Sequence, residues 1–481
     1  ISACLVGSEM CIRDSTYFGA PTGICVYEGT LLPERYRGQL LHTDAGPRQV
    51  RCYHLTPDGA SYAVDREDMV TSTDTWFRPS DICVGPDGSV YVADWYDPGV
   101  GGHGIGDFTR GRIYRLAPKG SKPSVPKVEL ESNAGVVAAL GSPNLAVRYM
   151  AMAKLRDMPA AAAWKAIQPA LEQTENPWLQ ARAVWQSALI AKRLDRSINS
   201  AIAVPKGRES DDRFQVLQMR AIREVFNRPP SLTAALDNGS AAVRREALLL
   251  LRDVDPAEAK PIILDLANKY DGKDRFYLEA VGIAVGHHDR ERRDVILADF
   301  DKEFPEWNDT VADLIWELQP PSVLPSLGKR LTDKALTPAQ RGRIVDILAA
   351  ADDKAAGAAL LPVLEAHAPP EVRQKVIDNL KLFLPNKWRD LRDSKELSES
   401  IRRLMDKPET RITALNLIAA AEKTDAVAQA ANAAADVKEA EPIRVAAAQT
   451  LGALPSDDGA AALAKLLDDG SPAVRVESAL A

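Results

Sequence analysis

The side chains that could do chemistry gather in one glycine-rich stretch, residues 94–107. It carries His103 together with three carboxylates, Asp94, Asp97 and Asp107. Carboxylate oxygens are ligands that Ca²⁺ prefers, so the three aspartates are candidates for a metal site. Glycine lets the backbone approach a ligand closely, and long loops on a rigid scaffold often carry function. The spacing matches no EF-hand loop, and an ordered loop whose aspartates cap turns is the alternative interpretation.

The residues around this stretch could hold a planar, anionic cofactor. Arg78 and Arg110 are the cationic candidates, because a guanidinium donates hydrogen bonds in a fixed fork. Aromatic side chains are dense here and could stack on a flat ligand, although such residues often fill the space between β-propeller blades. They are Trp76, Phe77, Trp95 and Tyr96. We expect Arg78, Arg110, Trp95 and His103 to be the cofactor contacts.

Composition and motifs disfavour several other classes of protein. The 481 residues carry a formal net charge of −7, which does not favour a nucleic-acid partner. No apolar run approaches the roughly 20 residues that a membrane span requires. The sequence holds no Ser–His–Asp, Walker-type or GxGxxG arrangement. The five cysteines form no CxxC or CxxCH motif, which argues against a zinc site or a disulfide framework. They are Cys4, Cys11, Cys25, Cys52 and Cys83.

Short strands over residues 16–118 must position the candidate residues. Apolar runs such as Ile82-Cys83-Val84 and Val90-Tyr91-Val92 flank Pro86-Asp87-Gly88, a sequence typical of a tight turn. At four strands per blade, this segment predicts a partial β-propeller of about two blades.

Two segments differ from their surroundings in composition. Residues 1–15 show neither strand alternation nor a helix cap, and we interpret them as a non-native leader. Residues 119–133 are rich in Pro, Lys and Ser and predict a linker.

From residue 134 to residue 481 the pattern is helical and repetitive. An arginine precedes an Ala- and Leu-rich run at intervals that include 31, 33, 34 and 38 residues. The clearest copies are Arg148, Arg182, Arg244, Arg373, Arg411, Arg444 and Arg475. This period, with two apolar helices per unit, predicts an α-solenoid, and the roughly ten to eleven units resemble HEAT repeats. We expect each repeating arginine to hydrogen-bond a neighbouring helix end or an acidic side chain. The last unit ends at Ala481 without a capping element, so we expect truncation there.

The expected fold class is therefore multidomain, a partial β-propeller followed by an α-solenoid. Residues 77–103 and 110–116, with Pro21 to Gly29, resemble the last propeller part of membrane-bound dehydrogenase-like, haem-binding proteins of planctomycete and verrucomicrobial type. In that family a propeller similar to quinoprotein glucose/sorbosone dehydrogenases precedes HEAT repeats and a c-type cytochrome module.

The resemblance implies an exported or periplasmic oxidoreductase that acts on sugars or alcohols. Pyrroloquinoline quinone and Ca²⁺ would be its cofactors, and a haem in a module beyond this chain would accept the electrons. In the quinoprotein dehydrogenases two arginines contact the quinone; Arg78 matches the first, and Ser80 stands in place of the second. The chain alone is predicted to be inactive, and the solenoid would then be a scaffold between the propeller and the cytochrome module.

The alternative function is a non-catalytic scaffold that binds a protein or a polysaccharide through its solenoid surface. A HEAT-type lyase or chaperone is a third interpretation, against which the β segment argues.

Overall fold

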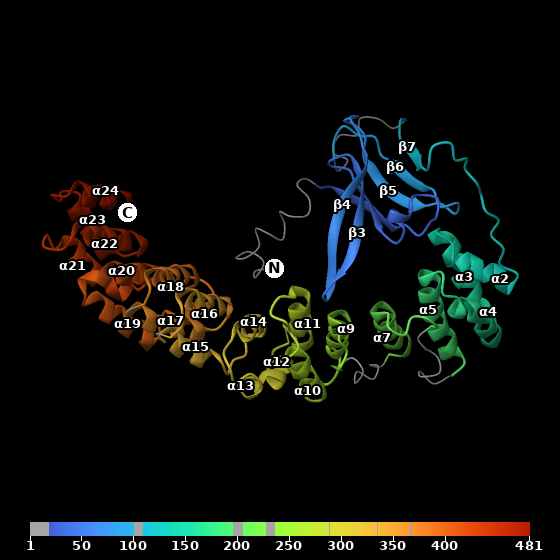
Figure 1. Ribbon diagram of the computed structural model, residues 1–481. Helices are drawn as coiled ribbons and strands as arrows, with labels where there is room; N and C mark the ends of the chain where they lie inside the picture. The colour runs from blue at the N-terminus through green and yellow to red at the C-terminus, as the bar shows by residue number, and fades with distance from the viewer. Residues whose placement is uncertain are drawn as a thin grey trace. The chain divides into compact units, whose positions relative to one another are not determined.

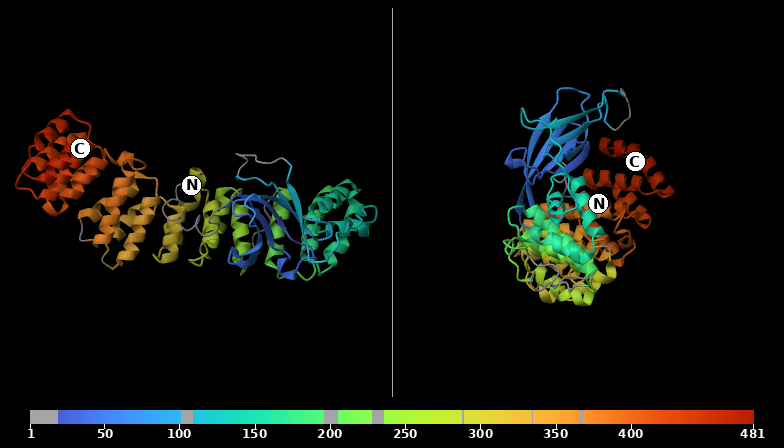
Figure 2. Two further views of the ribbon diagram at one scale, coloured as in Figure 1. Left: turned by 90° about the horizontal axis from the view of Figure 1, so that it is seen from above. Right: turned by 90° about the vertical axis from the view of Figure 1, so that its right-hand side faces the viewer.

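The computed structural model describes residues 19–100, 109–195, 205–227, 236–287, 289–333, 335–365 and 368–481. The chain divides into two compact units. The first comprises Ile1–Lys269 and Asp274–Ala284, and the second comprises Tyr270–Lys273 and Val285–Ala481. Strands lie only in the N-terminal part of what is described, and helices make up the rest (Figures 1 and 2).

Two small antiparallel sheets form the β part of the first unit. One has the order β1-β2-β3-β4, from Pro21–Val26, Leu40–Asp44, Gln49–Asp58 and Ser61–Thr71. The other has the order β5-β6-β7, from Pro79–Val84, Val90–Asp94 and Arg112–Leu116. The turn between β5 and β6 is the predicted one: Gly88 has a φ of 81°, and the Asp87 carboxylate accepts a hydrogen bond from the Ser89 amide.

The two sheets share one hydrophobic core. Leu41, Val50 and Cys52 come from the first sheet, with Tyr27 directly after β1, and Ile82, Val84, Val90 and Val92 come from the second. In β5 and β6 these residues alternate with more exposed ones, as in a strand with one buried face, whereas β2 and the start of β3 are buried on both faces. A sheet-built N-terminal part is thus confirmed. A closed propeller is not present among the described residues, and the assignment of the sheets to propeller blades stays a prediction.

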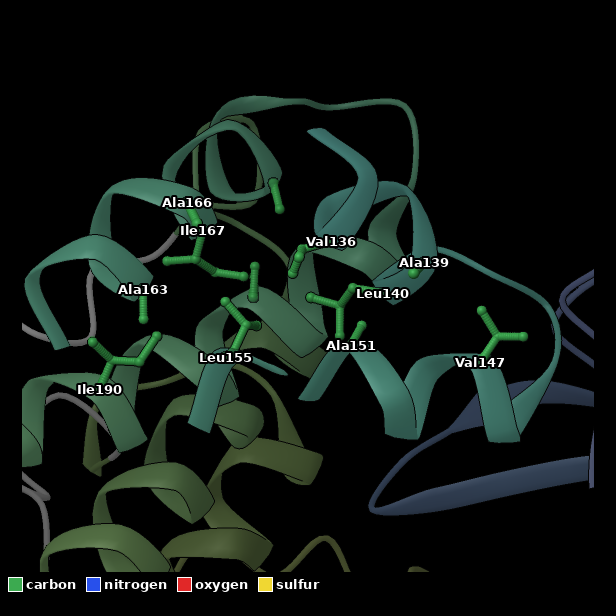
Figure 3. Packing of buried hydrophobic residues seen from close by; sticks show 12 residues of the cluster. Val136, Ala139, Leu140, Val147, Ala151, Leu155, Ala163, Ala166, Ile167 and Ile190 are labelled. Atoms are coloured by element: carbon green, nitrogen blue, oxygen red, sulfur yellow. The ribbon is translucent and has the colours of Figure 1, made fainter. Parts of the chain in front are cut away.

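Eight described helices of the first unit follow the sheets. They are α2 (Asn133–Leu140), α3 (Leu145–Asp157), α4 (Ala160–Glu172), α5 (Pro177–Arg193), α7 (Asp212–Phe226), α9 (Ala241–Leu251), α10 (Pro256–Ala267) and α11 (Arg275–Val285), whose last residue falls in the second unit. Side-chain caps mark several starts: Ser132, Asn144 and Asn176 each accept a hydrogen bond from an amide in the first turn. Leu140, Leu155, Ile167 and Ile190 bring α2, α3, α4 and α5 into one core (Figure 3).

The second unit is entirely helical in its described part. Its helices are α12 (Arg290–Leu297), α13 (Phe300–Glu303), α14 (Asp309–Leu318), α15 (Leu324–Leu331), α16 (Pro338–Ala350), α17 (Lys354–Glu365), α18 (Pro370–Phe383), α19 (Lys395–Met405), α20 (Arg411–Ala420), α21 (Val427–Ala435), α22 (Glu441–Ala453), α23 (Asp457–Leu466) and α24 (Pro472–Leu480). Alternate helices pack on each other, as in α20 on α22 and α22 on α24. This arrangement is that of an α-solenoid, and the prediction of a helical solenoid is confirmed.

The repeating arginine has the predicted structural role. Arg444 donates from Nε to the Ala434 carbonyl, at the end of the preceding helix, over 2.9 Å, and it forms an ion pair with Asp469 of the next repeat. Arg411 repeats the pattern with the Met405 carbonyl and Glu439. Because the last carbonyls of a helix lack intrahelical partners, these guanidinium groups satisfy them and link consecutive repeats.

Candidate functional site

Arg78, the first candidate cofactor contact, is engaged within the β part. Its guanidinium donates to the carbonyls of Phe77, Pro98 and Gly99 over 2.9, 3.0 and 3.2 Å. The side chain is buried, and its hydrogen bonds hold the loop after β6 against the start of β5. Ser80, at the second arginine position of the resemblance, donates to the Ala93 carbonyl over 3.3 Å.

The carboxylates of Asp94 and Asp97 shape the same loop. Asp94 Oδ1 accepts hydrogen bonds from the amides of Arg78 and Tyr96 over 2.8 and 3.0 Å. Asp97 Oδ1 accepts one from the Gly99 amide over 3.3 Å. Tyr96 has a φ of 54°, in the left-handed region, so the turn between the aspartates is a tight one. In this geometry the two carboxylates cap turns, as the alternative interpretation of these residues expects.

A cation site is incomplete in the described part of the loop. The second oxygens of Asp94 and Asp97 are buried and accept no hydrogen bond from any described residue. Arg112 Nη1 lies 4.0 Å from Asp94 Oδ2, and this positive charge disfavours a cation there. No group of three or more His, Cys, Asp or Glu side chains suited to a metal occurs among the described residues. His103 and Asp107 lie outside those residues, so the Ca²⁺ site stays a prediction.

The remaining two candidates, Trp95 and Arg110, lie at the surface. Trp95 is 57% exposed. The Arg110 guanidinium lies over the rings of Trp76 and Tyr96, 5.7 and 5.4 Å from their centroids. Arg112 lies over Tyr96 as well, at 4.2 Å. The structure thus brings Arg110 together with two of the predicted aromatic residues, Trp76 and Tyr96, and with Arg112.

A larger candidate site crosses α3, α5 and α7. It is a groove of about 760 Å³ whose apolar lining includes Tyr149, Met152, Trp185, Leu189 and Leu217. Tyr149 is 64% exposed and Leu189 is 41% exposed, although both are large apolar or aromatic side chains. We call this surface the α3–α5–α7 groove.

The sequence gives no clear indication of this groove. Trp185 and Leu189 stand four residues apart on α5 and share one helix face. Their spacing is also that of core residues, so the sequence signal alone is ambiguous.

Cationic side chains line one end of the groove. Arg156 lies in the last turn of α3, where it pairs with Asp157 over 3.2 Å, and Lys192 and Arg193 end α5; all three are exposed. Arg193 donates to the Leu155 carbonyl over 3.1 Å, and Lys192 donates to the Val225 carbonyl over 2.6 Å. Such cations are stabilised by the negative end of the helix dipole. Each keeps further N–H groups for an acidic ligand, since a guanidinium has five and an ammonium three.

A buried carboxylate joins the groove to the β part. Glu28 follows β1, and its side chain is only 8% exposed. It pairs with Arg148 Nη1 over 2.9 Å and with Arg182, the repeating arginines of two consecutive repeats. Burial lowers the pKa of Arg182, and the charge of Glu28 opposes that effect. Arg182 also lines the groove, so this network fixes one of its walls.

Comparisons with known proteins give little on function. Residues 6–120 match DUF7133, a domain of unknown function. No curated protein sequence matches the chain. Among solved structures, the chain is similar to Kap121p bound to Pho4p, with 12% sequence identity and a TM-score of 0.39. The match covers 72% of this chain and 44% of the Kap121p chain. It is also similar to the karyopherin Kap121p bound to the SUMO protease Ulp1p, with 11% identity and a TM-score of 0.35. That match covers 72% of this chain and 48% of the karyopherin chain. The chain therefore spans less than half of the length of these proteins.

Within the described residues, every helix is too short or too polar to cross a lipid bilayer.

Proposed function

We propose that the chain is a protein-binding scaffold, and that the α3–α5–α7 groove holds an apolar segment of the partner with acidic residues at its end. The observation that carries this proposal is the groove itself, which is lined by exposed Tyr149 and Leu189 and by half-buried Trp185. Aromatic side chains in such positions dominate the energy of protein interfaces.

Charge favours the same partner. The groove ends at Arg156, Lys192 and Arg193 in a chain whose formal net charge is −7. A local cationic rim on an acidic protein attracts a partner segment that ends in carboxylates. A polysaccharide, the other ligand of the scaffold interpretation, is less suited to an apolar groove of this kind.

A synthetic amphipathic helix, with leucine on one face and glutamate at its end, is the probe for this proposal. Its binding would be followed by fluorescence anisotropy with the full chain. The variant Leu189→Glu places a carboxylate in the groove and should weaken binding at least tenfold. Ile283→Glu is the matched control, because Ile283 is an aliphatic residue on α11 that is 40% exposed. Equal affinity of the two variants would contradict the proposal.

A second proposal concerns a longer protein that would contain this chain, an exported quinoprotein-type sugar or alcohol dehydrogenase with a haem module. The resemblance of residues 77–103 and 110–116, and the order of sheets before solenoid, support it. In that setting the groove would dock the electron-accepting module.

Arg78 and Ser80, the positions that the resemblance aligns with the quinone-binding arginines, do not fit pyrroloquinoline quinone. Arg78 is 7% exposed, and its guanidinium already donates to three backbone carbonyls. Ser80 likewise donates to a strand carbonyl. We therefore place binding by this chain in the solenoid rather than in the β part.

A further inference from the structure

The two sheets of the β part meet along β1 and β5. Later residues of β1 contact later residues of β5. The Thr22 hydroxyl donates to the Pro79 carbonyl over 2.8 Å. One residue further on, a Cβ added at Gly23 would lie 2.7 Å from Asp81 Cα and from the Ile82 amide nitrogen. The neighbours of successive β1 residues thus advance along β5, with an offset of about 58 positions in the chain.

The surroundings of Cys25 support the same alignment. The Cβ position of Gly23 points at β5. Gly23 and Cys25 are both partly buried, whereas the residues next to them in β1 are exposed, so the two share the inner face of the strand. Cys25 packs against the shared core, which contains Ile82 and Val84, the residues on either side of Cys83 in β5. At an offset of about 58 positions, Cys83 is the residue of β5 level with Cys25.

Charge coupling supports this placement. Burial raises the pKa of the Cys25 thiol to about 12, and the charge of Cys83 is the next contribution. The third described cysteine, Cys52, is fully buried in the shared core, and Glu67 and Arg35 are the charges that act on it. Cys25 is only partly buried and Cys83 is exposed, so an oxidant in solution can reach the pair.

We propose that Cys25 and Cys83 form a disulfide that links the two sheets when the protein meets a disulfide oxidant such as oxidised glutathione. The exposed Cys83 loses its proton, and its thiolate attacks the oxidant, releases one glutathione thiol and leaves a mixed disulfide. Cys25 then loses its proton, attacks the Cys83 sulfur and releases the second glutathione thiol. The two cysteines together lose two protons and two electrons, and one molecule of oxidised glutathione is reduced to two thiols.

The spacing of the cysteines gives no indication of this pair. Their contact depends on how two sheets pack, and an odd number of cysteines does not exclude a single bridge. The proposal is independent of the scaffold function, because it concerns covalent chemistry within the β part.

Peptide mapping of the full chain tests the proposal. Cys4 and Cys11 would first be replaced by serine, so that the three described cysteines remain. After incubation with oxidised glutathione at alkaline pH, we expect two of three thiols to be lost and a proteolytic fragment in which Cys25 and Cys83 are joined. The Cys83→Ser variant should retain both remaining thiols, apart from mixed disulfides that a brief reduction removes.

Cys52→Ser is the matched control and should form the Cys25–Cys83 link as the parent does. A parent that keeps three free thiols, or that forms a link through Cys52, would overturn the proposal. Mapping of the parent chain is decisive by itself, so a variant that fails to fold does not affect the outcome.

Discussion

Arginines act differently in the β part and in the solenoid. In the solenoid, Arg411 and Arg444 occupy equivalent positions and make equivalent bonds, to the end of the preceding helix and to an acid of the next repeat. In the β part, Arg78 donates hydrogen bonds to backbone carbonyls of a loop, and Arg110 lies over two aromatic rings. Repetition thus makes the role of a residue predictable, because each repeat contacts mainly its neighbours. Where contacts join distant segments, the residue type alone does not give the role.

The largest expected loss of stability comes from Glu28, which joins the β part to the first helical repeats. Glu28→Ala should lower the free energy of unfolding of the first unit by about 3 kcal/mol, because it leaves two arginines in a buried site without their shared anion. Thermal and guanidinium unfolding, followed by circular dichroism, would measure it.

Glu131→Ala is the control for that variant. Glu131 pairs with Lys154 over 3.1 Å, but its side chain is 88% exposed. Exposed ion pairs contribute about 0–1 kcal/mol, so this variant should unfold almost as the parent does. Equal losses in the two variants would show that Glu28 does not anchor the β part.

The solenoid should give a smaller and position-dependent effect. Arg444→Met removes a 6% exposed guanidinium from a helix-end carbonyl and from Asp469, and should cost about 2 kcal/mol. Arg475→Met, at the equivalent position of the last repeat, removes bonds to the Asp469 and Gly470 carbonyls and should cost about 0.5–1 kcal/mol. Chemical unfolding of both variants would measure these losses in free energy of unfolding. A larger loss for Arg475→Met than for Arg444→Met would contradict the interpretation.

The fold could be predicted from the sequence where its causes are local. The Pro86–Gly88 turn depends on the φ that glycine permits, and the helical repeats depend on short-range periodicity. The roles of Asp94 and Arg78 were not settled in advance, since each depends on a loop that folds back on β5. The α3–α5–α7 groove was missed because Trp185 and Leu189 have the spacing of core residues, and only the packing of three helices leaves them accessible.

The loop of the β part offers a modest test of the capping interpretation. Asp94→Ala leaves the amides of Arg78 and Tyr96 without their acceptor and should destabilise the β part by about 1–2 kcal/mol. Added Ca²⁺ should not change the unfolding midpoint of the parent if these carboxylates serve only as caps. A midpoint that rises with Ca²⁺ in the parent, and not in Asp94→Ala, would instead favour the metal site.

Asp87 gives an effect that depends on pH. Burial by itself would raise the pKa of its carboxyl, but hydrogen bonds from Ser89, the Ser124 amide and Arg115 hold the pKa at about 2. An unfolded aspartate has a pKa near 3.9. The stabilisation is therefore present above about pH 4 and is lost as the pH falls toward 2. Unfolding midpoints across this range should fall more steeply for the parent than for Asp87→Asn, and parallel curves would contradict the assignment.

The central claim is that ligand binding by this chain lies in the α3–α5–α7 groove and not in the β loop around Arg78. Hydrogen–deuterium exchange of the full chain tests it directly, with the leucine–glutamate helix in one sample and pyrroloquinoline quinone with Ca²⁺ in another. The account predicts that the peptide slows exchange in α3 and α5, and that the quinone leaves residues 78–100 unchanged. Protection of residues 78–100 by the quinone, with none in α3 and α5 by the peptide, would contradict it.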